Sequence, residues 1–247
     1  MSEKIFKSVL LSLSVCLAPI LAQADSIGLG ASWTNSPYKG YGGQFEPLPQ
    51  VDIDNGKFFI DDLSIGAYLY KTNNQEVTVD ISYLPVQFKP KDTDNRQLKK
   101  LDKRHPTAIA ELGYSITTAI GNISTTIGGD ILNNSNSVLL DASYNLAFSG
   151  DKWVVLPSLG LGWANSHHND YYYGISPQEA NRSDLPVHHA KSSFTPYASL
   201  TGSYKITKQI NGFAGMRIDK LTGDVKNSPM IEHSVVPSIF AGLNYAF

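Results

Sequence analysis

Cysteine, long apolar stretches and excess charge are all scarce in this chain of 247 residues. The single cysteine, Cys16, lies in an N-terminal segment that we expect to be removed, so a disulfide-stapled domain is excluded. No apolar run after residue 24 approaches the roughly 20 residues of a membrane-spanning helix, which excludes lipid-facing helices. The formal net charge of -2 indicates neither nucleic acid as a partner nor adsorption to anionic lipid as the main activity.

The first 24 residues have the order that is typical of a secretory signal peptide. Lys4 and Lys7 precede an apolar run from 9 to 21, and Ala24 ends the small-residue motif AQA. We therefore predict Sec-type export with cleavage after Ala24. The mature chain, 25–247, carries no linker, low-complexity tract or repeat that would divide it, so we expect a single domain.

The C-terminus reads as an amphipathic strand with an aromatic end. In GLNYAF, apolar Leu243, Tyr245 and Phe247 alternate with small or polar residues. A strand with two such faces needs an apolar medium outside and a polar one inside, which a closed barrel in lipid supplies. The same period of two recurs in 27–33, 123–131, 138–148 and 153–163. We therefore predict an all-β fold, an antiparallel transmembrane β-barrel in the outer membrane of a Gram-negative bacterium, in contact with its lipid.

Polar turns and loops separate the predicted strands. Short turn signals lie at 54–57, 72–75, 120–122, 149–152 and 207–209, and we expect them at the periplasmic end. Longer connections at 35–44, 89–106, 165–193 and 222–234, with tight ones near 61–62 and 133–137, are expected to face outward from the cell. This count gives twelve strands. Ten remains the alternative, because the stretch 46–69 is ambiguous.

Five prolines conflict with a barrel that has no edges, because each removes a donor from a strand ladder. They are expected at strand ends or bulges, which could move the strand boundaries by several residues. The five are Pro47, Pro49, Pro85, Pro196 and Pro237.

Seven charged residues fall on the polar parity of their strands and are predicted to face the lumen. Charges there must pair or be hydrated. Twelve strands enclose more space than eight but much less than a sixteen-stranded porin, which leaves two interpretations: a small, loop-occluded pore, or a plug of salt bridges. The candidate lumen residues are Asp80, Glu111, Asp130, Asp141, Lys205, Arg217 and Asp219.

The longest loop carries a cluster of aromatic and polar residues with two interpretations. Exposed tyrosines beside a glycine and a carboxylate could form a recognition surface, because tyrosine offers apolar area and a hydroxyl at low entropic cost. Alternatively, the tyrosines pack the loop over the barrel mouth or join an interfacial belt. The candidates are Tyr171, Tyr172, Tyr173, Gly174, Ser176, Glu179 and Arg182.

Histidines and serines of the same loop do not have the spacing of a metal or catalytic site. Zinc needs three or four ligands in a tetrahedral array, and paired histidines lack the spacing that presents both rings to one ion. Serines beside them lack a nucleophile elbow. We predict no catalytic residue, no metal and no cofactor. The residues considered are His167, His168, Asp170, His188 and His189 for zinc, and Ser166, His167 and Ser192 for hydrolysis.

Five segments in order along the mature chain carry a family resemblance. They read SPYKGY at 36–41, LDKR at 101–104, GGDILNNSN at 128–136, NDYYYGISPQEANRSDL at 169–185 and GDVKNSPMIEHS at 223–234. On these segments the chain resembles the MipA/OmpV family of outer-membrane proteins. The resemblance implies a non-catalytic scaffold that binds a murein lytic transglycosylase and links it to a bifunctional penicillin-binding protein in peptidoglycan remodelling. Other members, described as adhesins or channels, imply the alternative of a channel or recognition barrel.

The predicted periplasmic face offers little surface for such partners. It consists of short turns and the two chain ends, whereas a stable interface typically buries roughly 800 Å² per partner. The evident contacts are the stub at 25–26 and the basic turns with Lys57, Lys152 and Lys208. Their charges suit steering at the rim of an interface better than affinity.

Overall fold

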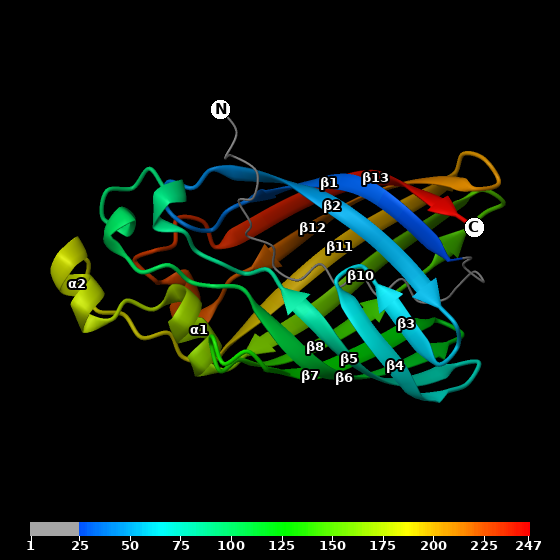
Figure 1. The fold of residues 1–247 in the computed structure, drawn as a ribbon, viewed down its shortest axis with the longest axis horizontal. Helices are drawn as coiled ribbons and strands as arrows, with labels where there is room; N and C mark the ends of the chain where they lie inside the picture. The colour runs from blue at the N-terminus through cyan, green and yellow to red at the C-terminus, as the bar shows by residue number, and fades with distance from the viewer. Residues whose placement is uncertain (1–24) are drawn as a thin grey trace.

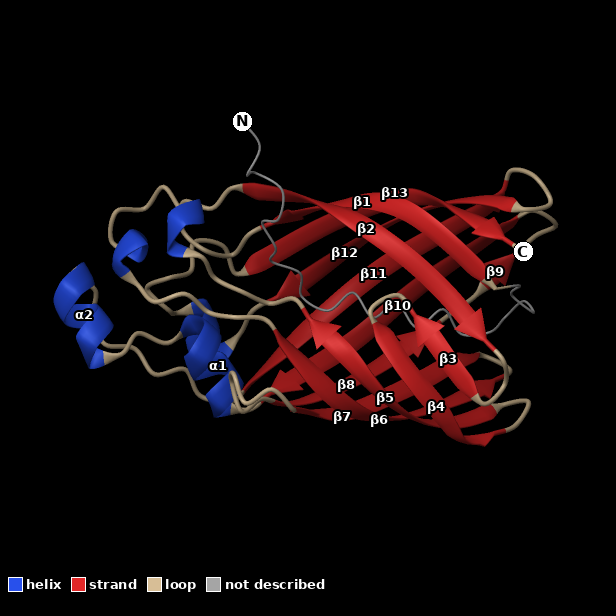
Figure 2. Ribbon diagram, in the orientation of Figure 1, coloured by secondary structure: helices blue, strands red, loops and turns tan. Residues whose placement is uncertain are grey.

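The protein, described over residues 25–247 in a computed structural model, is an antiparallel β-barrel (Figures 1 and 2). The predicted signal peptide lies outside the described residues. The strands are β1 (Ser26–Asn35), β2 (Gly43–Asp54), β3 (Phe58–Asp61), β4 (Ser64–Lys71), β5 (Gln75–Leu84), β6 (Thr107–Thr118), β7 (Gly121–Asp130), β8 (Val138–Asn145), β9 (Phe148–Ser149), β10 (Trp153–Ala164), β11 (Ser193–Lys205), β12 (Ile210–Lys220) and β13 (Val235–Ala246).

The ladder closes on itself and confirms the predicted twelve strands. β8 and the short β9 both pair with β10, so they form one interrupted strand. Pairing of β10 with β11 and of β13 with β1 completes the ring. The residues of β1 and β13 match from Ser26↔Ala246 to Thr34↔Ser238, which places the C-terminus beside the start of the described chain.

Alternation along the strands separates an apolar outer surface from a polar interior. Leu29 and Leu243 face each other across β1 and β13 and are exposed on the outside. The neighbouring pair, Gly28 and Asn244, lies on the opposite face of these strands and is small or polar. The two faces are those that lipid and a wet lumen require.

The two ends of the barrel differ. The turn end has short connections held by side-chain hydrogen bonds: Asn55 Oδ1 accepts from the Phe58 amide at 2.8 Å, and Thr207 Oγ1 accepts from the Ile210 amide at 2.9 Å. The loop end carries the long connections with α1 (Ser166–Tyr173), α2 (Pro177–Ser183), α3 (Gly223–Lys226) and two 3-10 turns, η1 (Pro90–Asp92) and η2 (Leu98–Lys100) (Figure 2). Within residues 25–247, no helix is long and apolar enough to cross a bilayer.

The long loops pack together into a folded cap over the loop end. Its core is apolar, with Tyr38, Phe88, Leu98, Tyr172 and Met230 almost fully buried. The rings of Tyr38 and Phe88 meet edge to face at 5.1 Å between centroids. Because these residues come from four different loops, the cap ties all the long connections together.

One hairpin is only half as long as predicted. β3 has four residues and β4 eight, and their connecting turn lies partway along the wall (Figure 1). The prediction that the tight connection at 61–62 faces outward from the cell is therefore wrong. The hairpin tip is fixed on both sides: the Asp62 amide donates to Val51 O at 2.8 Å, and the Tyr83 amide donates to Leu63 O at 3.0 Å.

Prolines occupy the places where a ladder stops. Pro196 and Pro237 lie near the starts of β11 and β13 but inside these strands: each is just beyond the end of one ladder and still pairs on its other side, Pro196 with Leu161 and Pro237 with Ile218. Pro85 follows the end of β5. Pro47 and Pro49 differ, because they lie inside β2 rather than at a strand end or bulge. They are tolerated because, within residues 25–247, β2 pairs at these positions with β1 alone.

Candidate functional site

The barrel encloses a cavity of about 1320 Å³. It extends from polar side chains at the turn end, among them Asp54, Asn122 and Asn244, to the underside of the cap at Tyr173 and Val225. The cap thus closes the loop end with apolar side chains. The interpretation of the lumen as a plug of salt bridges is wrong, since the middle of the barrel is hollow.

Acidic residues dominate the lining of this cavity. Among the described lining residues, Arg217 is the only arginine or lysine. A cavity with this imbalance attracts cations and repels anions. The nine acidic lining residues are Glu46, Asp52, Asp54, Asp61, Asp62, Glu76, Asp80, Glu111 and Asp141.

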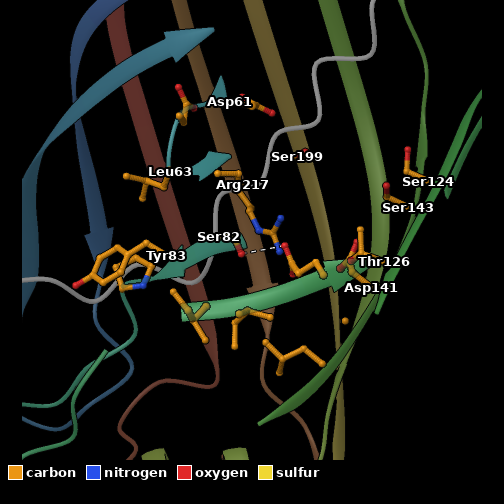
Figure 3. A pocket seen from close by; sticks show the side chains of 18 of the residues that line it. Asp61, Leu63, Ser82, Tyr83, Ser124, Thr126, Asp141, Ser143, Ser199 and Arg217 are labelled. Atoms are coloured by element: carbon orange, nitrogen blue, oxygen red, sulfur yellow. Dashed lines mark hydrogen bonds between the residues drawn. The ribbon is translucent and has the colours of Figure 1, made fainter. Parts of the chain in front are cut away.

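Two pairs of these carboxyl groups lie directly opposite each other on neighbouring strands. Asp52 pairs with Asp61 across β2 and β3, and Asp80 pairs with Glu111 across β5 and β6. Like charges at such positions destabilise a sheet. Ser82 Oγ donates to Glu111 Oε2 at 2.9 Å, which offsets part of this cost (Figure 3). The remaining repulsion between the paired carboxyl groups is a stability cost.

Arg217 binds Asp219 rather than the carboxyl groups of β2, β3 and β5. Lys71, which is outside the cavity lining, pairs with two of the lining carboxylates, Asp54 at 2.8 Å and Glu76 at 3.7 Å. The Nη2 of Arg217 donates to Asp219 Oδ1 at 2.7 Å, and its guanidinium lies 3.6 Å from the ring centroid of Tyr197. Tyr197 in turn donates to Asp141 Oδ1 at 2.9 Å. Figure 3 shows Arg217 and Asp141 reaching into the same space. This network lies on the β8, β11 and β12 side of the barrel, away from Asp52 and Asp61.

The predicted lumen residues divide into two groups. Asp80, Glu111, Asp141 and Arg217 line the cavity, as predicted. The other three do not. Asp130 ends β7 at the loop end and accepts from three backbone amides of the following turn, Leu132, Ser135 and Asn136. Lys205 is exposed where β11 ends, and Asp219 is buried against Arg217.

Six acidic lining residues were missed by the sequence analysis, and one of them, Glu76, lies at the start of β5. Glu46, Asp52, Asp54, Asp61 and Asp62 all belong to the stretch 46–69, whose strand boundaries were ambiguous. Glu46, Asp52 and Asp54 all have even numbers, and residues an even number of positions apart share one face of a strand. This alternation was the signal that could have placed them in the lumen.

The tyrosine-rich loop does not form the exposed recognition surface that was one of its two interpretations. Tyr172 and Tyr173 are buried in the cap core, and Gly174 is buried beside them. Tyr171 is half-buried, and its hydroxyl oxygen accepts a hydrogen bond from the His105 amide at 2.8 Å. Arg182 is the exposed member, bound to Asp102 at 2.6 Å. The loop-packing interpretation is confirmed.

Glu179 holds two loops of the cap together. Its Oε1 lies 2.9 Å from Arg104 Nη2 and accepts from the Asp102 amide at 2.9 Å, while Oε2 accepts from the Ser176 amide at 3.0 Å in a capping box that begins α2. Burial alone would raise the pKa of Glu179. The hydrogen bonds and the Arg104 guanidinium outweigh it, so the pKa lies below its usual value.

The loop histidines have separate partners. His168 Nδ1 lies 2.8 Å from Ser137 Oγ, His188 Nε2 lies 3.0 Å from the Asp224 carbonyl, and His189 Nδ1 lies 3.3 Å from Asp170 Oδ2. Across the described part of the chain, no three His, Cys, Asp or Glu side chains are arranged to hold a metal ion. Burial lowers the pKa of His168 to about 4, against a smaller opposing effect of Asp130.

The candidate periplasmic contacts Lys57, Lys152 and Lys208 lie in three turns of the turn end and are exposed. Next to them, Lys71 Nζ forms an ion pair with Asp54 Oδ2 at 2.8 Å. The turn end thus presents separate basic side chains around an acidic cavity.

The closed ladder, the apolar outer surface and the polar lumen define an outer-membrane β-barrel. Residues 27–247 match the family model described as MltA-interacting protein MipA, and the chain belongs to this family. It is 31% identical to the MltA-interacting protein of Escherichia coli (strain K12), over 98% of this chain and 99% of that one. It is 29% identical to the putative outer membrane protein YiaT of Escherichia coli O157:H7, over 94% of each. Among solved structures, the CymD monoaromatic hydrocarbon channel superposes with a TM-score of 0.43 at 9% identity, over 91% of this chain and 89% of that one.

Proposed function

We propose that this protein is a non-catalytic scaffold in the outer membrane that binds a murein lytic transglycosylase and links it to a bifunctional penicillin-binding protein. The observation that carries the proposal is its 31% identity, over nearly the full length of both chains, to a protein named for interaction with MltA. Such coverage includes every turn of the turn end, which is the part that a periplasmic enzyme meets.

The geometry of the turn end favours a contact that is steered by charge. Its turns are short, and a stable interface typically buries roughly 800 Å² on each partner. Lys57, Lys152 and Lys208 are exposed there and are free to approach an acidic surface. Charges at the rim of an interface raise the association rate and the salt dependence more than the affinity.

The test measures retention of purified lytic transglycosylases and penicillin-binding proteins by the folded barrel at moderate salt, and the rate of their association with it at low salt. Reversing Lys57, Lys152 and Lys208 to glutamate is expected to slow association about tenfold at low salt, because steering is lost. The matched control reverses Lys91, Lys99 and Lys103, which are exposed at the loop end and should leave retention unchanged. Retention no greater than that by an unrelated barrel would refute the scaffold.

The hollow, acidic lumen favours a second candidate function, a small cation-selective channel. Among the described lining residues, nine are acidic and one is an arginine, and only Asp54 and Glu76 of the nine pair with a lysine, Lys71. This excess of acidic residues predicts that cations pass in preference to anions. In planar bilayers, Asp80→Asn with Glu111→Gln is expected to lower the cation-to-anion permeability ratio several-fold. Glu232→Gln, at an exposed position of the loop end, is the control. A wild-type protein that passes no ions, with the cap intact or cleaved, would exclude this function.

A further inference from the structure

The barrel wall has a gap between β2 and β5 on its loop-end side. The β3–β4 hairpin fills the space between these strands only as far as the Val51 and Tyr83 contacts of its tip. From Gly43 to Gln50, β2 pairs with β1 alone, and no ladder joins β2 to β5 anywhere in residues 25–247. We call this opening, between residues 43–50 and the end of β5 above the hairpin tip, the side gap.

Three prolines line the side gap, and their positions prevent a strand from closing it. The amide and the carbonyl of Val51 both bind Asp62, on the side of β2 opposite to β1. Every second residue of β2, counted from Val51, therefore directs its backbone N–H and C=O away from β1. Pro47 and Pro49 share that parity and therefore remove two donors from the free edge. Pro85 removes one at the end of β5. An added strand would find no donors at these positions, so neither β2–β5 pairing nor a partner's strand is favoured.

The free edge of β2 must be hydrated, because unpaired carbonyls are not tolerated against lipid tails. The carbonyl groups of Pro47 and Pro49 point into the side gap by the same parity. The cavity reaches this edge, since its lining includes Pro47, Pro49, Leu63 and Tyr83. The side gap therefore joins the wet lumen to the bilayer.

The chemistry of the side gap changes from apolar to acidic over its depth. Phe45, Leu63 and Tyr83 stand at the outer surface with exposed fractions of 76%, 45% and 46%. Figure 3 shows Leu63 and Tyr83 near Asp61 on one side of the cavity. Behind them, the buried Oε1 of Gln50 has no hydrogen-bond donor within the described residues. An ammonium group would donate to that oxygen and be attracted by the acidic wall.

We infer that the side gap is a lateral portal through which single-chain amphiphiles with a cationic head enter the lumen from the bilayer. The apolar chain lies against Phe45, Leu63 and Tyr83, and the ammonium group enters among Gln50, Asp61 and the acidic residues beyond. This inference uses the cavity of the second candidate function and is independent of the scaffold.

The test uses a twelve-carbon alkylamine that carries a photoreactive diazirine, with the alcohol and the carboxylate of the same chain as comparisons. The protein is held in nanodiscs of zwitterionic lipid, and adducts are mapped by mass spectrometry. The amine is expected to label lumen-facing peptides of β2 and β5 about tenfold more than either comparison, which corresponds to about 1.4 kcal/mol. Equal labelling by all three probes would overturn the assignment of a cationic head.

Two variants test the route. Leu63→Trp, at the hairpin tip, should slow labelling of the lumen about tenfold. Leu159→Trp, at a lipid-facing position of β10, should not change it. Tyr83→Ala widens the same opening and should speed labelling, which keeps the test decisive if Leu63→Trp does not fold. Unchanged rates in the folded Leu63→Trp and Tyr83→Ala proteins would overturn the portal, even where cation-selective conductance is retained.

Discussion

Glu179→Ala is expected to open the cap at a cost of about 3–5 kcal/mol, because it leaves Arg104 buried without its counter-charge. The Arg104 side chain is 9% exposed and that of Glu179 is 3% exposed, so water cannot replace the lost carboxylate. The substitution also removes the acceptor for two backbone amides. The Ser176 amide lies at the start of α2, and the Asp102 amide belongs to the loop 89–106. The barrel ladder does not include these residues and should persist.

Limited proteolysis of the folded barrel measures this effect. Cleavage within 89–106 and 165–193 should rise at least tenfold in Glu179→Ala, while the strands stay resistant. Glu179→Gln keeps a hydrogen-bond acceptor but not the charge, so its cleavage rate should lie between those of the wild-type protein and Glu179→Ala. Glu232→Ala is the control, since its exposed carboxylate makes one hydrogen bond, to the Gly40 amide at 3.2 Å. Wild-type resistance in Glu179→Ala would show that the pair does not hold the cap.

Strands and turns were predictable because lipid on one side and water on the other impose a period of two. The alternation around Leu243 and the Thr207 turn signal each survive in the structure. The other turn and loop positions agree because polar connections are disfavoured in the hydrocarbon, and the connection at 61–62 is the exception.

The half-length hairpin could not be predicted, and with it half of the acidic wall was missed. Four residues, Phe58–Asp61, are too few to show a period, and the turn after them has no glycine. Asp62 adopts a left-handed conformation with φ of 47° instead, which aspartate tolerates better than most residues. Its side chain also accepts from the Val51 amide at 3.3 Å, a contact that sequence spacing does not reveal.

The fate of the tyrosines depended on contacts between distant loops. Tyr172 and Tyr173 end a short helix whose sequence has no clear apolar face, so the local pattern does not distinguish buried from exposed. Their partners include Tyr38, whose ring centroid lies 5.8 Å from that of Tyr173. Only the assembled cap brings these loops together.

Acidification is expected to loosen the cap through His168. Burial lowers the pKa of this residue to about 4, whereas an exposed histidine titrates near 6.5. Between these values the open cap binds a proton that the closed cap does not, so the stability of the closed cap falls as the pH falls from about 6.5 toward 4. The difference corresponds to about 3 kcal/mol, and below pH 4 the loss levels off because both forms are protonated.

Hydrogen exchange of the α1 amides as a function of pH, corrected for intrinsic rates, measures this loss. His168→Asn keeps a polar atom near Ser137 Oγ, which binds the His168 ring at 2.8 Å, but it does not titrate. Its exchange should therefore show a flatter dependence between pH 6.5 and 4. The neighbouring His167 is exposed, and His167→Asn should keep the wild-type dependence. If His168→Asn retained the full pH dependence, the proton would be taken up elsewhere in the cap, because no other change distinguishes the two proteins in that range.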